Sequence, residues 1–116
     1  MASCTEVTYV KGLLVGDPLD VKMFESTGWL LDEDSQTNED VILANVYPPA
    51  SKIKFSSQIL RRFEFSSKLQ RMSCICRNIC DGKYRAFVKG SPEMLSTLCK
   101  KESLPSNFNQ VLDKYT

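Results

Sequence analysis

A five-residue segment, 89–93 (KGSPE), combines a lysine with the signals that end a strand and begin a helix. The residues before it, 84–88, alternate in a way typical of a strand. Ser91 is the expected N-cap of the following helix, and Pro92 takes its first helical position. The segment therefore predicts that the ammonium group of Lys89 lies where two stretches of backbone approach each other closely.

Two further segments carry side chains suited to contacting a ligand. Residues 15–20 (VGDPLD) present two carboxylates around a predicted helix start, and residues 63–73 (FEFSSKLQRMS) combine aromatic, hydroxyl and cationic groups. Each also has an ordinary structural interpretation. Phe65 fits a core aromatic, Lys89 fits a solvated strand end, and Asp20 fits an exposed helical residue or second cap.

Together the three segments resemble the nucleotide-binding (N) domain of P-type ATPases. The KGSPE run is similar to the KGxPE motif at the nucleotide pocket of that family. The runs GDPLDVKMFE, FSSKLQRMS and VKGSPE most resemble the type V class, subgroup B, which comprises endosomal and lysosomal transporters of polyamines or cations. The resemblance covers nearly all of the 116 residues.

The resemblance implies a site for the adenosine part of ATP. Phe65 matches the aromatic residue that stacks on adenine, a contact worth ~1–3 kcal/mol. Lys89 matches the lysine that lines the adenine pocket and extends toward the phosphates, and Asp20 matches the acidic residue near the adenine amino group. Gly90 lets the backbone approach the base without a Cβ clash.

The turn that follows Phe65 is the expected phosphate side of this site. Ser66, Gln70 and Arg71 lie on it. Many relatives have a lysine where Gln70 stands, and this departure leaves open which cation meets the phosphates. Arg71 and Lys68 are both candidates, because a guanidinium group in particular chelates phosphate well.

The same resemblance implies a larger parent protein. We expect residues 1–116 to be a single nucleotide-binding domain, excised and C-terminally shortened, that binds Mg-ATP without a structural metal. It would bring the terminal phosphate to an aspartate on another domain, with the phosphorylation and actuator domains of the same chain as partners. The isolated domain is expected to be inactive, monomeric and not membrane-inserted. The domain would face the cytosol as part of a multi-pass protein of the endosome or lysosome membrane.

Three alternatives remain open at this point. The first is an interaction module of the same fold that no longer binds nucleotide, and the second is the N domain of a subgroup A type V ATPase. The third rests on charge, because residues 51–116 hold thirteen basic and five acidic side chains, whereas residues 1–50 hold two and nine. A basic half can attract nucleic acid. Readout motifs for nucleic acid are absent, so we expect no such partner.

Other chemistry is excluded by composition. The chain has no histidine, which removes Ser-His and Cys-His nucleophilic pairs and most zinc sites. It has five cysteines and no visible signal sequence, which indicates reduced thiols. Cys74 and Cys76 fall in a predicted strand, and we expect their thiols on opposite faces. There is no P-loop motif, no apolar run near 18 residues, and the DKYT run at 113–116 lacks the glycine of a phosphorylation motif.

The elements that must position these residues indicate an α+β fold, an antiparallel sheet with helices packed on it. Residues 32–40 are acidic and polar and predict a mobile surface loop. Asp81-Gly82 predicts a hairpin turn. The expected elements are a strand or short helix end at 4–15, a helix from Pro18 to Thr27 stopped by Gly28, strands at 41–46, 59–65, 69–77 and 84–88, and helices at 91–99 and 105–115, the last with Ser103 or Ser106 near its cap.

Overall fold

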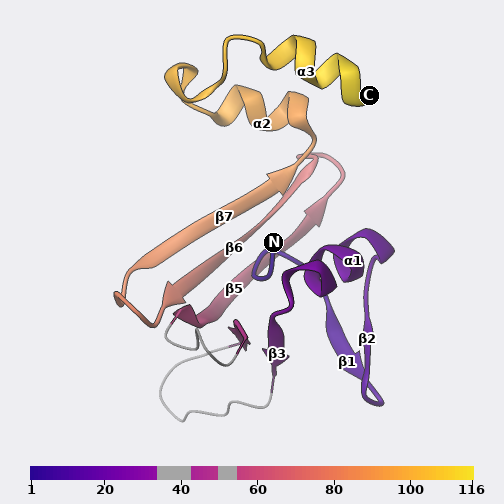
Figure 1. The fold of residues 1–116 in the computed structure, drawn as a ribbon, viewed down its shortest axis with the longest axis vertical. Coiled ribbons are helices and arrows are strands. Elements are labelled where there is room, and N and C mark those ends of the chain that lie inside the picture. Colours follow the sequence, from indigo (N-terminus) through magenta and orange to yellow (C-terminus); the bar gives the residue numbers. More distant parts are fainter. Residues whose placement is uncertain (34–42, 50–54) are drawn as a thin grey trace.

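The computed structural model describes residues 1–33, 43–49 and 55–116. Its main element is a five-stranded antiparallel sheet in the order β3-β4-β5-β6-β7, accompanied by a separate two-stranded hairpin, β1-β2. Figure 1 shows the long strands β5 to β7 at the centre, with α1 and the hairpin on one side and α2 and α3 beyond one end of the sheet. The predicted α+β class is therefore confirmed.

The N-terminal part forms a hairpin followed by a helix. β1 (Thr8–Val10) and β2 (Leu13–Val15) are joined by two residues with positive φ, Lys11 at 50° and Gly12 at 78°, which is the backbone of a tight hairpin turn. The segment predicted as a strand or short helix end thus holds two strands.

Helix α1 (Pro18–Thr27) has the predicted ends. Asp17 is its N-cap, and its carboxylate accepts a hydrogen bond from the Leu19 N–H at 3.0 Å. Pro18 opens the helix, and Gly28 closes it in the left-handed conformation with φ at 69°. These local signals fix where the carboxylate of Asp20, in the first turn, emerges from the helix.

Two short strands form one edge of the sheet. β3 (Leu30–Asp32) was not predicted, and β4 (Ala44–Tyr47) overlaps the predicted strand at 41–46. The predicted acidic loop, 32–40, begins inside β3, and Glu33 accepts a hydrogen bond from the Thr8 hydroxyl at 2.7 Å. Its remaining residues lie outside the described part of the chain.

Three longer strands carry most of the predicted site. β5 (Ser57–Ser66), β6 (Arg71–Asn78) and β7 (Tyr84–Gly90) pair in sequence order. The predicted turn at Asp81-Gly82 joins β6 to β7, with Gly82 at φ 68°. Asp81 accepts hydrogen bonds from the Lys83 N–H and from Arg85. The Arg85 guanidinium is the main reason that the pKa of Asp81 is lowered to about 2.

The core lies between the sheet, the N-terminal segment and α1. Phe24 of α1 is only 2% exposed, and it packs with aliphatic and thiol side chains from the N-terminus and from β3 to β6. The buried apolar residues are Ala2, Cys4, Val7, Phe24, Leu31, Ala44, Val46, Ile59, Met72, Cys74 and Cys76. In this core the N-terminal segment packs against strands that are far from it in the sequence. The N-terminal segment is therefore part of the folding unit.

The expectation that Cys74 and Cys76 lie on opposite faces is wrong. Residues two apart in a strand point to the same face, and the two Sγ atoms are 3.6 Å apart in the core. Thiol contacts with Cys4 and Cys76, together with burial, raise the pKa of Cys74. The three side chains act as small apolar groups that fill the core.

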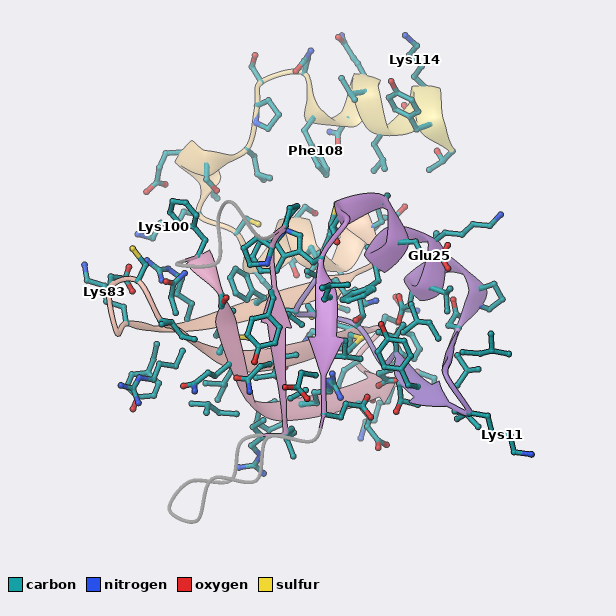
Figure 2. The ribbon with its side chains drawn as sticks, turned by 60° about the horizontal axis from the view of Figure 1, so that its bottom comes forward. Lys11, Glu25, Lys83, Lys100, Phe108 and Lys114 are labelled. Atoms are coloured by element: carbon teal, nitrogen blue, oxygen red, sulfur yellow. The ribbon has the colours of Figure 1, made fainter. Side chains whose placement is uncertain are left out.

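The C-terminal residues form α2 (Pro92–Leu98), a 3₁₀ turn η2 (Lys101–Ser103) and α3 (Phe108–Tyr115). None of the three has a fully buried residue, in contrast to α1. The N-cap of α3 is Asn107, which makes no capping side-chain bond, rather than Ser103 or Ser106. Figure 2 shows Phe108 pointing back toward the rest of the molecule and Lys114 pointing away from it.

Candidate functional site

A cavity of about 600 Å³ opens where the N-terminal segment, α1 and the ends of β5 and β7 meet. This volume lies within the range of small-molecule sites. The lining is mostly apolar, with three carboxylates and one ammonium group among its side chains. The lining residues are Glu6, Asp17, Leu19, Asp20, Met23, Phe65, Met72, Lys89 and Gly90.

Phe65 lines this cavity and is not part of the buried core. The residue is 58% exposed, whereas Phe24 on α1 is 2% exposed. The interpretation of Phe65 as a core aromatic is therefore wrong. An apolar ring that stays in solvent beside a cavity offers a flat face to which a second flat ring can stack.

Asp20 is a buried carboxylate with two partners. It is 7% exposed, so it is not the exposed helical residue of the alternative interpretation. One carboxylate oxygen, Oδ2, accepts a hydrogen bond from the Glu6 N–H at 3.3 Å, and the other, Oδ1, contacts the Nζ of Lys89. A buried charge needs such pairing, and the arrangement fixes the direction in which the carboxylate faces the cavity.

Lys89 lies next to the end of β7 and forms an ion pair with Asp20. Its side chain is 29% exposed, so it is not a solvated strand end. Lys89 stands opposite Met72 in the sheet register, and both side chains line the cavity. The ammonium group and the Phe65 ring therefore border the same space.

Gly90 also lines the cavity. A side chain is excluded at this position because the backbone at Gln70 and Arg71 lies too close. A Cβ at this position would lie 2.4 Å from the carbonyl oxygen of Gln70 and 3.1 Å from the Cα of Arg71. Essentially no real Cβ contact is that short. The glycine is thus required by the close approach of β7 to the turn before β6, independently of any ligand.

Ser66, Gln70 and Arg71 are not among the residues that line the cavity. They build the turn between β5 and β6. The Ser66 hydroxyl accepts a hydrogen bond from the Leu69 N–H at 3.2 Å, and its carbonyl accepts one from the Gln70 N–H at 2.6 Å. Gln70 adopts a left-handed backbone with φ at 53°, and its side chain lies 3.5 Å from the Ser91 hydroxyl.

Five lining residues were not among the predicted site residues. Asp17 and Leu19 lie in the 15–20 segment, of which only Asp20 was assigned a site role, and Met23 and Met72 fit packing positions as well as cavity walls. Glu6 gave no signal. The Glu6 carboxylate accepts a hydrogen bond from the Phe65 N–H at 3.0 Å across 59 residues of sequence, a contact that a local pattern does not encode.

The comparison with known families decides where this fold belongs. The family model described as P-type ATPase, cytoplasmic domain N, matches residues 25–111 of the 116-residue chain. The chain belongs to this family. The matched range of the N domain includes Phe65 and Lys89, whereas Glu6 and Asp20 precede it.

Curated P-type ATPases align with this N domain over its whole length. Polyamine-transporting ATPase 13A3 of Homo sapiens is 39% identical, probable cation-transporting ATPase 13A4 of Gallus gallus is 43% identical, and vacuolar cation-transporting ATPase YPK9 of Saccharomyces cerevisiae is 36% identical. Each alignment covers 100% of this chain but only 10–11% of the relative. The chain thus spans about a tenth of the length of these relatives.

Across residues 1–33, 43–49 and 55–116, no three His, Cys, Asp or Glu side chains are grouped so as to hold a metal ion. In the same ranges, no helix has the length and apolar character needed to cross a membrane.

Proposed function

We propose that this N domain binds ATP by its adenosine part in the cavity beside Phe65 and leaves the triphosphate outside. The observation that carries the proposal is that an aromatic residue, Phe65, which is 58% exposed, and the Asp20–Lys89 pair line one cavity of about 600 Å³. A purine would stack on the ring, a contact worth ~1–3 kcal/mol. The Asp20 carboxylate, an acceptor only, suits the amino group of adenine.

The charges around the cavity support this orientation. Glu6, Asp17 and Asp20 outnumber the single cation, Lys89, among the lining residues. The like charges of a triphosphate would be repelled by these carboxylates in a partly enclosed space. The neutral, flat base therefore enters, and the phosphates extend toward solvent, where Arg71 and Lys68 remain candidate contacts. Magnesium would arrive with the phosphates.

Binding is expected to be weak. One ring stack and a few partly exposed hydrogen bonds correspond to about −4 to −5 kcal/mol, or a dissociation constant of roughly 0.2–1 mM. In the parent protein, the domain would carry the terminal phosphate to an aspartate on the phosphorylation domain. Phosphoryl transfer of this kind depends mainly on positioning and charge neutralisation.

We further propose that the parent is a type V ATPase of subgroup B that transports polyamines or cations. The support is the sequence runs noted above and the names of the relatives, which are polyamine-transporting or cation-transporting ATPases. One relative is named as vacuolar, which supports an endosomal or lysosomal membrane for the parent. Measuring ATP hydrolysis by the full-length protein in vesicles, with polyamines and with metal cations added in turn, tests this assignment, and hydrolysis that neither kind of cation stimulates would contradict it.

The nucleotide proposal is tested by adding ATP to ¹⁵N-labelled protein and following each amide resonance. We expect saturable shifts concentrated at Phe65, Asp20 and Lys89, with half-saturation below a few millimolar. The competing interpretation, an interaction module that has lost nucleotide binding, predicts no shifts at several millimolar ATP. Shifts spread over the basic residues of 51–116 without saturation would likewise contradict the proposal.

A further inference from the structure

The end of β5 contains a bulge between Phe63 and Ser66, beside the cavity. Phe63 pairs with Ser73 and Ser66 pairs with Arg71, so two residues of β5 stand opposite one residue of β6, Met72. A bulge of this kind redirects the side chains near it, and the extra residue leaves the regular ladder of hydrogen bonds. A group from outside the sheet accepts the Phe65 N–H.

That group is the side chain of Glu6. Its Oε1 accepts the Phe65 N–H at 3.0 Å, and its own backbone N–H donates to Asp20 Oδ2 at 3.3 Å. Asp20 in turn pairs with Lys89. A single series of contacts therefore links the backbone of Phe65, the Asp20 carboxylate and the Lys89 ammonium group, and Glu6 joins Phe65 to Asp20.

We propose that Glu6 is a positioning residue, whose carboxylate holds the bulged backbone of Phe65 so that the ring faces the cavity. The inference rests on the proposed nucleotide function, which it deepens by naming the residue that prepares the stacking surface. A hydrogen bond to an ionised acceptor is stronger than one between neutral groups. Because both partners of this bond belong to the domain itself, it can hold the ring without help from the nucleotide, which reduces the entropy lost on binding.

The test uses three variants of the full 116-residue chain. Glu6→Ala removes the acceptor, Glu6→Gln keeps an oxygen acceptor without the charge, and Glu64→Ala removes a carboxylate from an exposed neighbour of Phe65 as the matched control. The Glu6 N–H remains in every variant, so its bond to Asp20 can persist. Two quantities are measured: the Phe65 amide and ring resonances without nucleotide, and the dissociation constant for ATP.

We expect Glu6→Ala to move the Phe65 resonances and to weaken ATP binding about fivefold to tenfold. Glu6→Gln should retain most of the affinity, and Glu64→Ala should match the wild type. Unchanged Phe65 resonances in Glu6→Ala would overturn the proposal. Unchanged ATP affinity in Glu6→Ala, with the wild type binding normally, would also overturn it.

The two proposals fail in different ways. If the wild type does not bind ATP at several millimolar, the proposed function fails. The Phe65 ring resonances of Glu6→Ala without nucleotide then still decide whether Glu6 positions the ring, because this readout needs no ligand.

Discussion

Asp20 and Lys89 form an ion pair that joins the first turn of α1 to the end of β7 across 69 residues of sequence. The Asp20 side chain is 10% exposed and that of Lys89 is 29% exposed. The pair thus has two roles that can be separated: it fastens the N-terminal part to the sheet, and it presents polar groups to the cavity.

The first role predicts a loss of stability when one partner is removed. Asp20→Ala leaves a partly buried ammonium group without its carboxylate, and we expect the free energy of unfolding in urea to fall by about 1–2 kcal/mol, less than for a fully buried pair because Lys89 is partly exposed. Glu25→Ala, at an exposed position of the same helix, is the control. In a double-mutant cycle, additive effects of Asp20→Ala and Lys89→Ala would show that the pair has no coupling energy.

A second prediction concerns Gly90. Gly90→Ala places a Cβ 2.4 Å from the Gln70 carbonyl oxygen, so backbone must move. We expect a destabilisation of about 1–3 kcal/mol, together with shifts of amide resonances in the β5–β6 turn. Gly82→Ala is the comparison: its φ of 68° is unfavourable for alanine, but no atom lies within 4 Å of the added Cβ. Equal, small effects of both substitutions on the unfolding midpoint would contradict the close approach described here.

The acidic lining of the cavity predicts that the phosphates contribute little to affinity. Adenosine, AMP and ATP should bind within about fivefold of one another, because stacking on Phe65 supplies most of the binding energy. Competition against a fluorescent adenine nucleotide, measured at two salt concentrations, checks this. A hundredfold preference for ATP that weakens steeply with salt would instead indicate that cations such as Arg71 dominate binding.

Features encoded locally were predictable from the sequence. Asp17, Pro18 and Gly28 set the ends of α1, and the Asp81-Gly82 turn separates β6 from β7. These signals depend on backbone preferences within a few residues. The resemblance to the N-domain family then indicated which of these elements were expected to hold the site residues.

Features that depend on distant contacts were not predictable in this way. Glu6 becomes part of the cavity only because the N-terminal segment packs against β5, 59 residues away. The bulge beside Phe65 is a property of how two strands pair, which no single strand reveals. The expectation for Cys74 and Cys76 failed for a different reason, since the period of a strand itself places such a pair on one face.

The central claim is that the Phe65 ring is the surface on which the base of ATP stacks, and Phe65→Ala tests it most directly. Phe63→Ala is the matched control, because Phe63 is also an exposed aromatic of β5, 41% accessible, but does not line the cavity. We predict by calorimetry that Phe65→Ala weakens ATP binding about tenfold or more, with little change in stability, while Phe63→Ala binds like the wild type. Equal ATP affinity in Phe65→Ala and the wild type would contradict the account.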